Sequence, residues 1–359
     1  MPGYFPPYID PMKITLRTLL LSAAFPLLAS CHHVEEWDGG MQGNFDALWT
    51  IVDEHYCFFD EKGIDWQETG KRYRARINPE EMKATDFFNL CGQMLNELCD
   101  GHVNLSSSFN TSYYRRWWSD YPQNFDERLI QQYYLEFDYA QAGPLSYKVL
   151  HDSIGYMRVS TMSGGIPEGA LDVSLMSFAD AGCNSIVIDV RDNGGGMMTT
   201  AERLVSRFFD GRILAGYISH KTGPGHNDFS EPYPFHYDTA SGHVRWLRPV
   251  VLLTNRSTFS AANNFVSIMR LLPNVRIAGD TTGGGSGMPY SSELPCGWAV
   301  RMSACPVYDA EMRLTEHGVP PSDGCRIDLD PQLALQGTDT MLEFALDLAA
   351  DWREWIEKK

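Results

Sequence analysis

The stretch IVIDVRDNGGG (Ile186–Gly196) decides the fold when it is read together with VVLLTNRSTFSAANNFV (Val250–Val266). Each stretch begins as an apolar, β-branched run, continues into a polar or glycine-rich turn and then takes on helical spacing. The three glycines of the first turn allow backbone N–H groups to approach a ligand closely. The second turn ends at Ser260, where a helix is expected to begin. An anion cradle and a hydroxyl in two such units indicate acyl-transfer chemistry.

Strand and helix patterns alternate around these two units. We expect a strand pair at 147–159 with a turn near Asp152, and strands at 185–190, 212–219, 249–253 and 275–278. Helical spacing predicts helices at 169–182, 199–209, 261–272 and 339–356. The polar segment 223–242 is interpreted as a surface loop. This alternation implies an α/β fold with a mostly parallel sheet covered by helices.

The first third of the chain has a different character. Residues 44–105 carry apolar residues at helical spacing, which predicts a helical cap. Residues 106–359 then form the α/β core, which begins with a variable, aromatic-rich linker at 106–145. The aromatic run Tyr113–Trp118 within this linker is interpreted as packing, with a substrate groove as the alternative.

Composition excludes some classes of function. The 359 residues carry a net charge of -17, and no basic stripe could follow a phosphate backbone, so nucleic acid is not expected as a partner. The eight cysteines form no metal-ligand spacing, and neither a metal ion nor an organic cofactor is expected. Cys296 and Cys305 are possible disulfide partners, but the sequence does not pair them.

The N-terminus has the features of a secretion signal. Lys13 and Arg17 supply positive charge, and a short apolar run at 19–28 follows them. Leu28-Ala29-Ser30-Cys31 then resembles the lipobox at which bacterial lipoproteins are processed. The apolar run is too short for a comfortable membrane span.

These features predict a lipoprotein signal at 1–31 and a flexible tether at 32–43. Met12 is a possible true start, in which case the first eleven residues are an extension. Acylation of Cys31 would anchor the mature protein to a membrane of the bacterial envelope, facing the periplasm or the cell surface. An ordinary signal peptide and a buried helix are the alternatives.

Several motifs, taken in order, resemble the tricorn and C-terminal processing peptidase family of serine peptidases. The chain is most similar to the tricorn-like bacterial lipoproteins, and the likeness extends from about Asn44 to the C-terminus. The motifs are Asp100-Gly101-His102, the turn Asp189–Gly196, the segment Thr254–Ala262, the turn Leu294–Trp298, the element Glu316–Pro321 and the closing stretch Gly337–Ala345.

The resemblance implies that Ser260 is the nucleophile. A serine in the first turn of a helix has its alkoxide favoured by the helix dipole, and Ala261 leaves space for a substrate. The alternative is a serine that caps the helix, which is common at such positions.

His102 is the expected general base. Processing peptidases use a lysine downstream of the nucleophile, but Gly285 stands at that position here. The Asp100-Gly101-His102 motif is intact, and a histidine titrates near neutrality. A loop histidine without a catalytic role is the alternative, and His317 is a weaker competing base.

The resemblance further implies that Glu316 orients the histidine. Tricorn-like members carry a second serine beside the histidine, where this chain has Gly101, so a triad of Ser260, His102 and Glu316 is expected. Backbone N–H groups of Gly195 and Ala261 are the predicted oxyanion hole.

The resemblance implies a crotonase/ClpP-like spiral core with the helical cap. The fifty residues between cap and core are too few for a PDZ domain, so none is expected. The implied function is a serine endopeptidase that cleaves peptides or unfolded chain ends, bound as an extended strand. An inactive peptide-binding lipoprotein on the same scaffold is the main alternative, and an acyl-CoA enzyme of similar architecture is the second.

Overall fold

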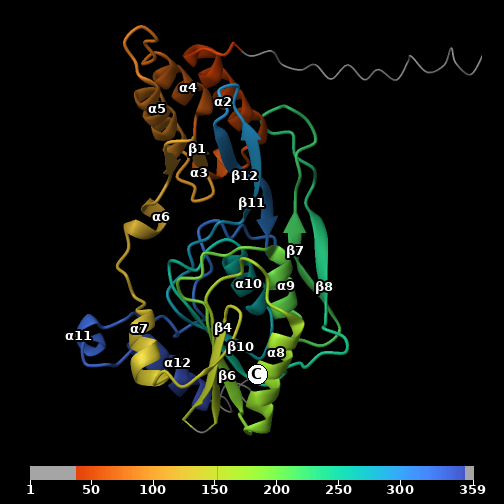
Figure 1. Cartoon of the computed structure of the whole chain (residues 1–359). Coiled ribbons are helices and arrows are strands. Elements are labelled where there is room, and N and C mark those ends of the chain that lie inside the picture. Colours follow the sequence, from red (N-terminus) through yellow and green to blue (C-terminus); the bar gives the residue numbers. More distant parts are fainter. Residues whose placement is uncertain (1–37, 152, 352–359) are drawn as a thin grey trace, which may run out of the picture. The chain divides into compact units, whose positions relative to one another are not determined.

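The computed structural model describes residues 38–151 and 153–351 (Figure 1). Cys31, the signal segment and most of the expected tether therefore lie outside the described residues. No helix in the described ranges combines the length and the apolar character needed to cross a membrane.

The core sheet has the strand order β10-β9-β6-β5-β4-β3. Its central strands β5 (Ile154–Val159), β6 (Ser185–Asp189), β9 (Val250–Thr254) and β10 (Val275–Gly279) run parallel. Antiparallel strands β4 (Leu145–Leu150) and β3 (Ala140–Ala142) complete it. The expected α/β class with a mostly parallel sheet is confirmed.

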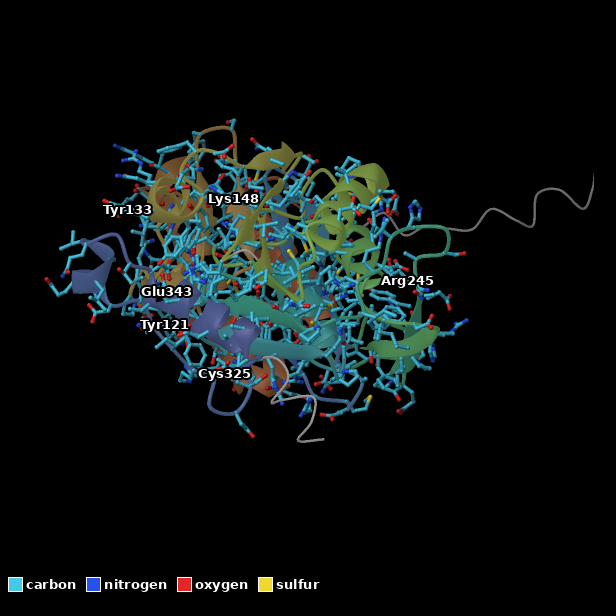
Figure 2. All side chains as sticks on the ribbon, turned by 90° about the horizontal axis from the view of Figure 1, so that it is seen from below. Tyr121, Tyr133, Lys148, Arg245, Cys325 and Glu343 are labelled. Carbon is cyan, nitrogen blue, oxygen red and sulfur yellow. The ribbon has the colours of Figure 1, made fainter. Side chains whose placement is uncertain are left out.

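Alternating side chains of the parallel strands supply two separate cores, as expected for a sheet that is covered on both faces. Ile186 and Ile188 face α8 (Glu168–Asp180), α9 (Met198–Val205) and α10 (Ala261–Met269). Val187 faces α12 (Thr340–Ala350) on the other side. Figure 2 labels Glu343 of α12. Its Oε1 accepts a hydrogen bond from the Tyr134 hydroxyl at 2.7 Å.

A second sheet joins the cap to the core. Strand β1 (Asn104–Ser106) follows the cap and pairs antiparallel with β12 (Ala299–Tyr308). The order is β2-β1-β12-β7-β8, and β11 pairs with β12. The remaining strands are β2 (Thr111–Tyr113), β7 (Arg212–Ile218), β8 (Tyr233–Asp238) and β11 (Gly287–Glu293).

The cap helices lie beside the β11–β12 hairpin (Figure 1). They are α2 (Met41–His55), α3 (Phe59–Lys62), α4 (Trp66–Arg74) and α5 (Ala84–Asn96). Apolar side chains such as Phe45, Leu48 and Phe88 are fully or almost fully buried here. The linker holds β2, α6 (Arg116–Ser119), α7 (Glu127–Leu129), the π-helical turn Ile130–Tyr134 and β3, and no PDZ domain is inserted. The short helix α11 (Pro331–Ala334) precedes α12.

Two expectations need correction, and the open question of a disulfide is answered. The segment 223–242 is not all loop, because β8 lies within it and pairs with β7. Helix α2 begins at Met41 inside the expected tether, since the Asn44 side chain donates hydrogen bonds to the carbonyls of Gly39 and Gly40. Cys296 and Cys305 are free thiols, like the other cysteines of the described part.

Candidate active site

Ser260 lies in a strained turn between β9 and α10. Its backbone has φ 58° and ψ -122°, a conformation that a non-glycine residue adopts only when its surroundings impose it. Its amide donates to the Gly284 carbonyl at 2.8 Å, which holds the turn. The side chain makes no capping hydrogen bond to α10, so the interpretation of Ser260 as a helix cap fails.

The Ser260 hydroxyl instead contacts His102, which follows the cap helices. Ser260 Oγ and His102 Nε2 are 2.9 Å apart, across 158 positions of sequence. His102 lies in the turn between α5 and β1 and is 4% exposed. This distance is within the range required for proton transfer between a nucleophile and its base.

Two neighbours fix the position of His102. Its amide donates to Asp100 Oδ1 at 2.7 Å, which ties the histidine to the first residue of its motif. On the other side of the ring, Nδ1 lies 3.4 Å from Ser303 Oγ on β12. When Nε2 accepts the serine proton, Nδ1 carries a hydrogen and can donate it to that hydroxyl.

Glu316 enters the site but does not touch the histidine. Its Oε1 accepts a hydrogen bond from Lys62 Nζ at 2.9 Å, and its Oε2 accepts from the Ser286 amide at 2.9 Å. Lys62 Nζ also lies 3.7 Å from Asp100 Oδ2. Glu316 is therefore connected to His102 only indirectly, through Lys62 and Asp100. The Glu316 carboxylate also anchors the loop beside Ser260, by accepting from the Ser286 amide.

These buried charged groups shift one another's pKa values. Burial raises the pKa of Glu316 to about 7, with the Asp100 charge adding to the effect and Lys62 opposing it. Burial also raises the pKa of Asp100, but the charges of Lys62 and His102 outweigh it and the net pKa is lowered. Burial lowers the pKa of His102 to about 4; the charges of Arg301 and Lys62 lower it further, and Asp100 opposes them. His102 is thus neutral at pH 7 and able to accept a proton.

Two departures from the family pattern have steric causes. A Cβ at Gly101 would lie 2.6 Å from Trp117 Nε1, so the second serine of tricorn-like members has no room here. Trp117 stacks on Phe259 with ring centroids 4.1 Å apart. A Cβ at Gly285 would lie 2.5 Å from the Phe259 ring, and the backbone there has φ +78°, which excludes a lysine.

The predicted oxyanion hole is modified by the structure. Ala261 is the first residue of α10, where amides have no acceptor within the helix. The Gly195 amide, in contrast, donates to Asn193 Oδ1 at 2.9 Å and is not free. The neighbouring Gly196 lines the same pocket as Ser260 and Ala261.

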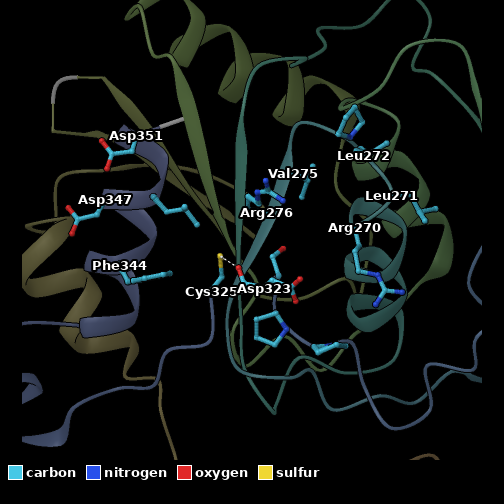
Figure 3. A pocket seen from close by; sticks show the side chains of 15 residues that line it. Arg270, Leu271, Leu272, Val275, Arg276, Asp323, Cys325, Phe344, Asp347 and Asp351 are labelled. Carbon is cyan, nitrogen blue, oxygen red and sulfur yellow. Dashed lines mark hydrogen bonds between the residues drawn. The ribbon is translucent and has the colours of Figure 1, made fainter. Parts of the chain in front are cut away.

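A cavity of about 360 Å³ opens beside Ser260, between the 196–199 loop, α10 and the β11–β12 hairpin. A larger groove of about 1040 Å³ lies between α10, β10 and α12, and residues such as Arg270, Cys325 and Phe344 line it (Figure 3). Neither Ser260 nor His102 lines that groove, so its size does not make it the reaction site.

The structure adds Lys62, Asp100 and Ser303 to the residues expected from sequence. Asp100 belongs to a quoted motif and could have been identified from it. Lys62 and Ser303 lie in ordinary helix and strand patterns, and only their proximity in space identifies them.

Comparison with known proteins identifies the family of the chain. The model of peptidase family S41 matches residues 153–323, and that of the tricorn protease C1 domain matches residues 40–96. A putative peptidase from Parabacteroides merdae is 45% identical, with a TM-score of 0.81 over 87% of this chain and 97% of that one.

Two more distant structures share the fold. The photosystem II D1 C-terminal processing protease is 14% identical with a TM-score of 0.54, over 87% of this chain and 98% of that chain. The tricorn protease is 16% identical with a TM-score of 0.54, over 87% of this chain and 37% of that chain. No curated protein matches the chain. Motifs, fold and a relative of high identity together place this chain in peptidase family S41, and it is a peptidase.

Proposed function

We propose that the chain is a serine-type endopeptidase that works through an acyl-enzyme. The observation that carries the proposal is the distance of 2.9 Å between Ser260 Oγ and His102 Nε2. A strained serine backbone without a capping bond supports it, since such strain is typical of nucleophile turns. An inactive binding protein would have no need to keep this pair together.

The reaction follows from the geometry. Ser260 Oγ attacks the peptide carbonyl carbon while its proton passes to His102 Nε2. The Ala261 amide donates to the developing oxyanion, and the 195–196 loop supplies a second donor; Gly195 would first have to leave Asn193. The protonated His102 then gives its proton to the departing amine, which leaves the acyl group on Ser260. In the second half of the reaction, water gives a proton to His102 and attacks the acyl carbon; His102 then returns the proton to Ser260 Oγ as the bond to the acyl group breaks and the acid is released.

A fluorophosphonate probe tests this mechanism on the full chain. The wild-type protein should be labelled and should cleave unfolded polypeptide, and Ser260→Ala should do neither. Ser257→Ala is a matched control, because this serine lies in the same turn and its side chain makes no hydrogen bond within the described residues. Labelling that persists in Ser260→Ala would assign the nucleophile elsewhere, and absence of both activities would favour the peptide-binding alternative.

We further propose that the enzyme acts on peptides or unfolded chain ends in the bacterial envelope, tethered by acylated Cys31. The lipobox-like sequence at 28–31 supports the tether. Fractionation should find the wild-type protein with membranes and Cys31→Ala in the soluble envelope fraction. Equal distribution of the two proteins would contradict the anchor.

A further inference from the structure

The pocket beside Ser260 contains an arginine without a hydrogen-bonded counterion, and the charge of Asp100 acts on it only from a distance. Arg301 on β12 is the one charged side chain among the described residues that line the pocket. It is neither fully buried nor fully exposed, and its guanidinium makes no hydrogen bond or ion pair with any described residue. Partial burial of an unpaired guanidinium is costly, because water is removed and no acceptor replaces it.

Two further polar atoms in the same pocket lack partners. Ser286 Oγ and Asn264 Oδ1 are both buried and make no hydrogen bond within the described residues. Buried polar atoms in native proteins are nearly always hydrogen-bonded, so an unpaired group in a pocket points to a ligand or a water. The Ser286 hydroxyl and the Arg301 guanidinium can both donate to a small anionic group, whereas Asn264 Oδ1 can only accept a hydrogen bond.

Most of the remaining large side chains of the lining are apolar, and Thr199 and Thr315 are the other polar ones. Met197 and Met198 form one side, and Met288 and Val307 belong to the hairpin on the other. Such walls suit the methylene groups of a side chain that ends in a polar head. A purely apolar occupant would bury Arg301 without replacing its water, and a cationic occupant would be repelled by the guanidinium.

Ser260 and Ala261 line the pocket, and in the proposed mechanism they contact the carbonyl of the bond that is cleaved. The pocket therefore receives the side chain of the residue that supplies this carbonyl. We propose that the pocket selects an acidic side chain, glutamate or aspartate, immediately before the cleaved bond, with its carboxylate on Arg301. This inference rests on the proposed function, since it describes the substrate of the same site.

The charge distribution bears on the proposal in two ways. The net charge of -17 disfavours acidic peptides in general, so the proposed preference depends on the local contact with Arg301. The positive charge of Arg301 also contributes to the lowered pKa of His102. A substrate carboxylate on Arg301 offsets that charge and makes His102 a stronger base when the correct substrate is bound.

A set of matched, internally quenched peptides tests the proposal. They differ only in the residue before the cleaved bond, which is Glu, Gln, Leu or Lys, and mass spectrometry locates the cut. The wild-type protein should favour Glu over Gln by about 10- to 100-fold in kcat/KM, the range expected for a charge-assisted hydrogen bond. Equal rates for Glu and Gln, or an acidic preference only after the bond, would overturn the proposal.

Variants then test whether Arg301 is responsible. Arg301→Gln should lose the preference for Glu over Gln, and Arg301→Lys should keep part of it, because an ammonium retains the charge but not the planar pair of donors. Arg245→Gln is the matched control, since Arg245 pairs with Asp210 on another part of the surface and should leave the preference intact. A Glu preference that survives in a folded Arg301→Gln protein would overturn the assignment.

Fluorophosphonate labelling separates the two levels of proposal. Labelling of Ser260 without a preference for Glu would contradict the assignment of the pocket to an acidic side chain, but not the serine mechanism. Absence of both labelling and cleavage in the wild-type protein would sink the mechanism, and the specificity with it.

Discussion

Two buried clusters in this peptidase each place one cation between two carboxylates. They differ in whether the cation is within hydrogen-bonding distance of both carboxylates or of only one. In the core, the Arg191 guanidinium bonds Asp189 through Nε and Nη2 and bonds both oxygens of Asp339 through Nη1, at 2.7–3.2 Å. Beneath His102, Lys62 Nζ bonds Glu316 at 2.9 Å but remains 3.7 Å from Asp100. The planar guanidinium of Arg191 hydrogen-bonds both of its carboxylates, whereas the ammonium of Lys62 hydrogen-bonds only one.

The pKa values follow this difference. Burial raises the pKa of Asp189, but the charges of Arg191 and Arg158 outweigh it, and the net pKa is lowered. Glu316 shares its cation, and burial raises its pKa to about 7. Asp100 Oδ2 is buried without a hydrogen bond. The satisfied cluster lies in the core, and the incompletely satisfied one lies beside His102, the base that we propose.

The largest expected effect is a loss of stability when the Arg191 cluster is disrupted. Arg191→Met leaves two carboxylates in a fully buried site and should cost about 3–5 kcal/mol of unfolding free energy. Denaturant unfolding measures this loss. Arg245→Met, whose partner Asp210 is exposed, should change stability by only about 0–1 kcal/mol. Similar losses for the two variants would contradict the structural role.

Lys62→Met should cost less, and its cost should depend on pH. At pH 8 we expect a loss of about 1–3 kcal/mol, since Glu316 and Asp100 lose their cation. Removal of Lys62 raises the folded-state pKa of Glu316 above about 7, whereas the unfolded value stays near 4.5. The deficit is therefore small near pH 5 and grows as pH rises through the folded pKa.

Denaturant unfolding at pH 5 and pH 8 measures this change. Lys71→Met is the matched lysine control, because its pair with Glu68 is exposed and should contribute little at either pH. An equal deficit for Lys62→Met at both pH values would refute the shared-cation account.

The wild-type pH profile sharpens the comparison at His102 itself. Because the pKa of His102 is lowered to about 4, kcat/KM should stay near its plateau from pH 7 down to about pH 5. A histidine with a pKa near 6.5 would lose about thirtyfold at pH 5. Circular dichroism at each pH checks that the fold persists, and a midpoint near pH 6.5 would contradict the buried, neutral imidazole.

The smallest effect concerns the far side of the imidazole. Ser303→Ala removes the hydroxyl 3.4 Å from His102 Nδ1 and should lower kcat by about 2- to 10-fold, the equivalent of about 0.5–1.5 kcal/mol. Ser177→Ala on α8 removes a comparable side-chain hydrogen bond far from the site and should leave kcat unchanged. Unchanged kcat in Ser303→Ala would mean that other contacts suffice to orient the ring.

Much of the core followed from local patterns. The strands 185–189 and 250–254 are short apolar runs that end in polar turns, and each lies within a residue of its expected place. Burial on both faces requires such runs, so composition alone reveals them. Strand β8 was missed because it pairs at a sheet edge and carries Pro234 and His236, which are poor strand signals.

The site was predicted less completely. Ser260 and His102 stand in motifs, and the structure brings their side chains together. Their catalytic roles remain proposals. Glu316 and Lys62 are 254 positions apart in the sequence, and no local pattern predicts their contact. The Gly195 amide is engaged by Asn193, two residues away, which the glycine turn alone did not reveal.

The sequence by itself determined the α/β class, the order of strands and helices and the identity of the candidate nucleophile and base. Those features depend on periodicity, turn chemistry and short motifs, which are local properties of the chain. Only the tertiary structure decided that Trp117 fills the space of a second serine, that Lys62 lies between Glu316 and Asp100, and that Arg301 is left without a hydrogen-bonded counterion beside Ser260. These depend on which distant side chains share a buried volume, and packing and electrostatics settle that only once the chain has folded.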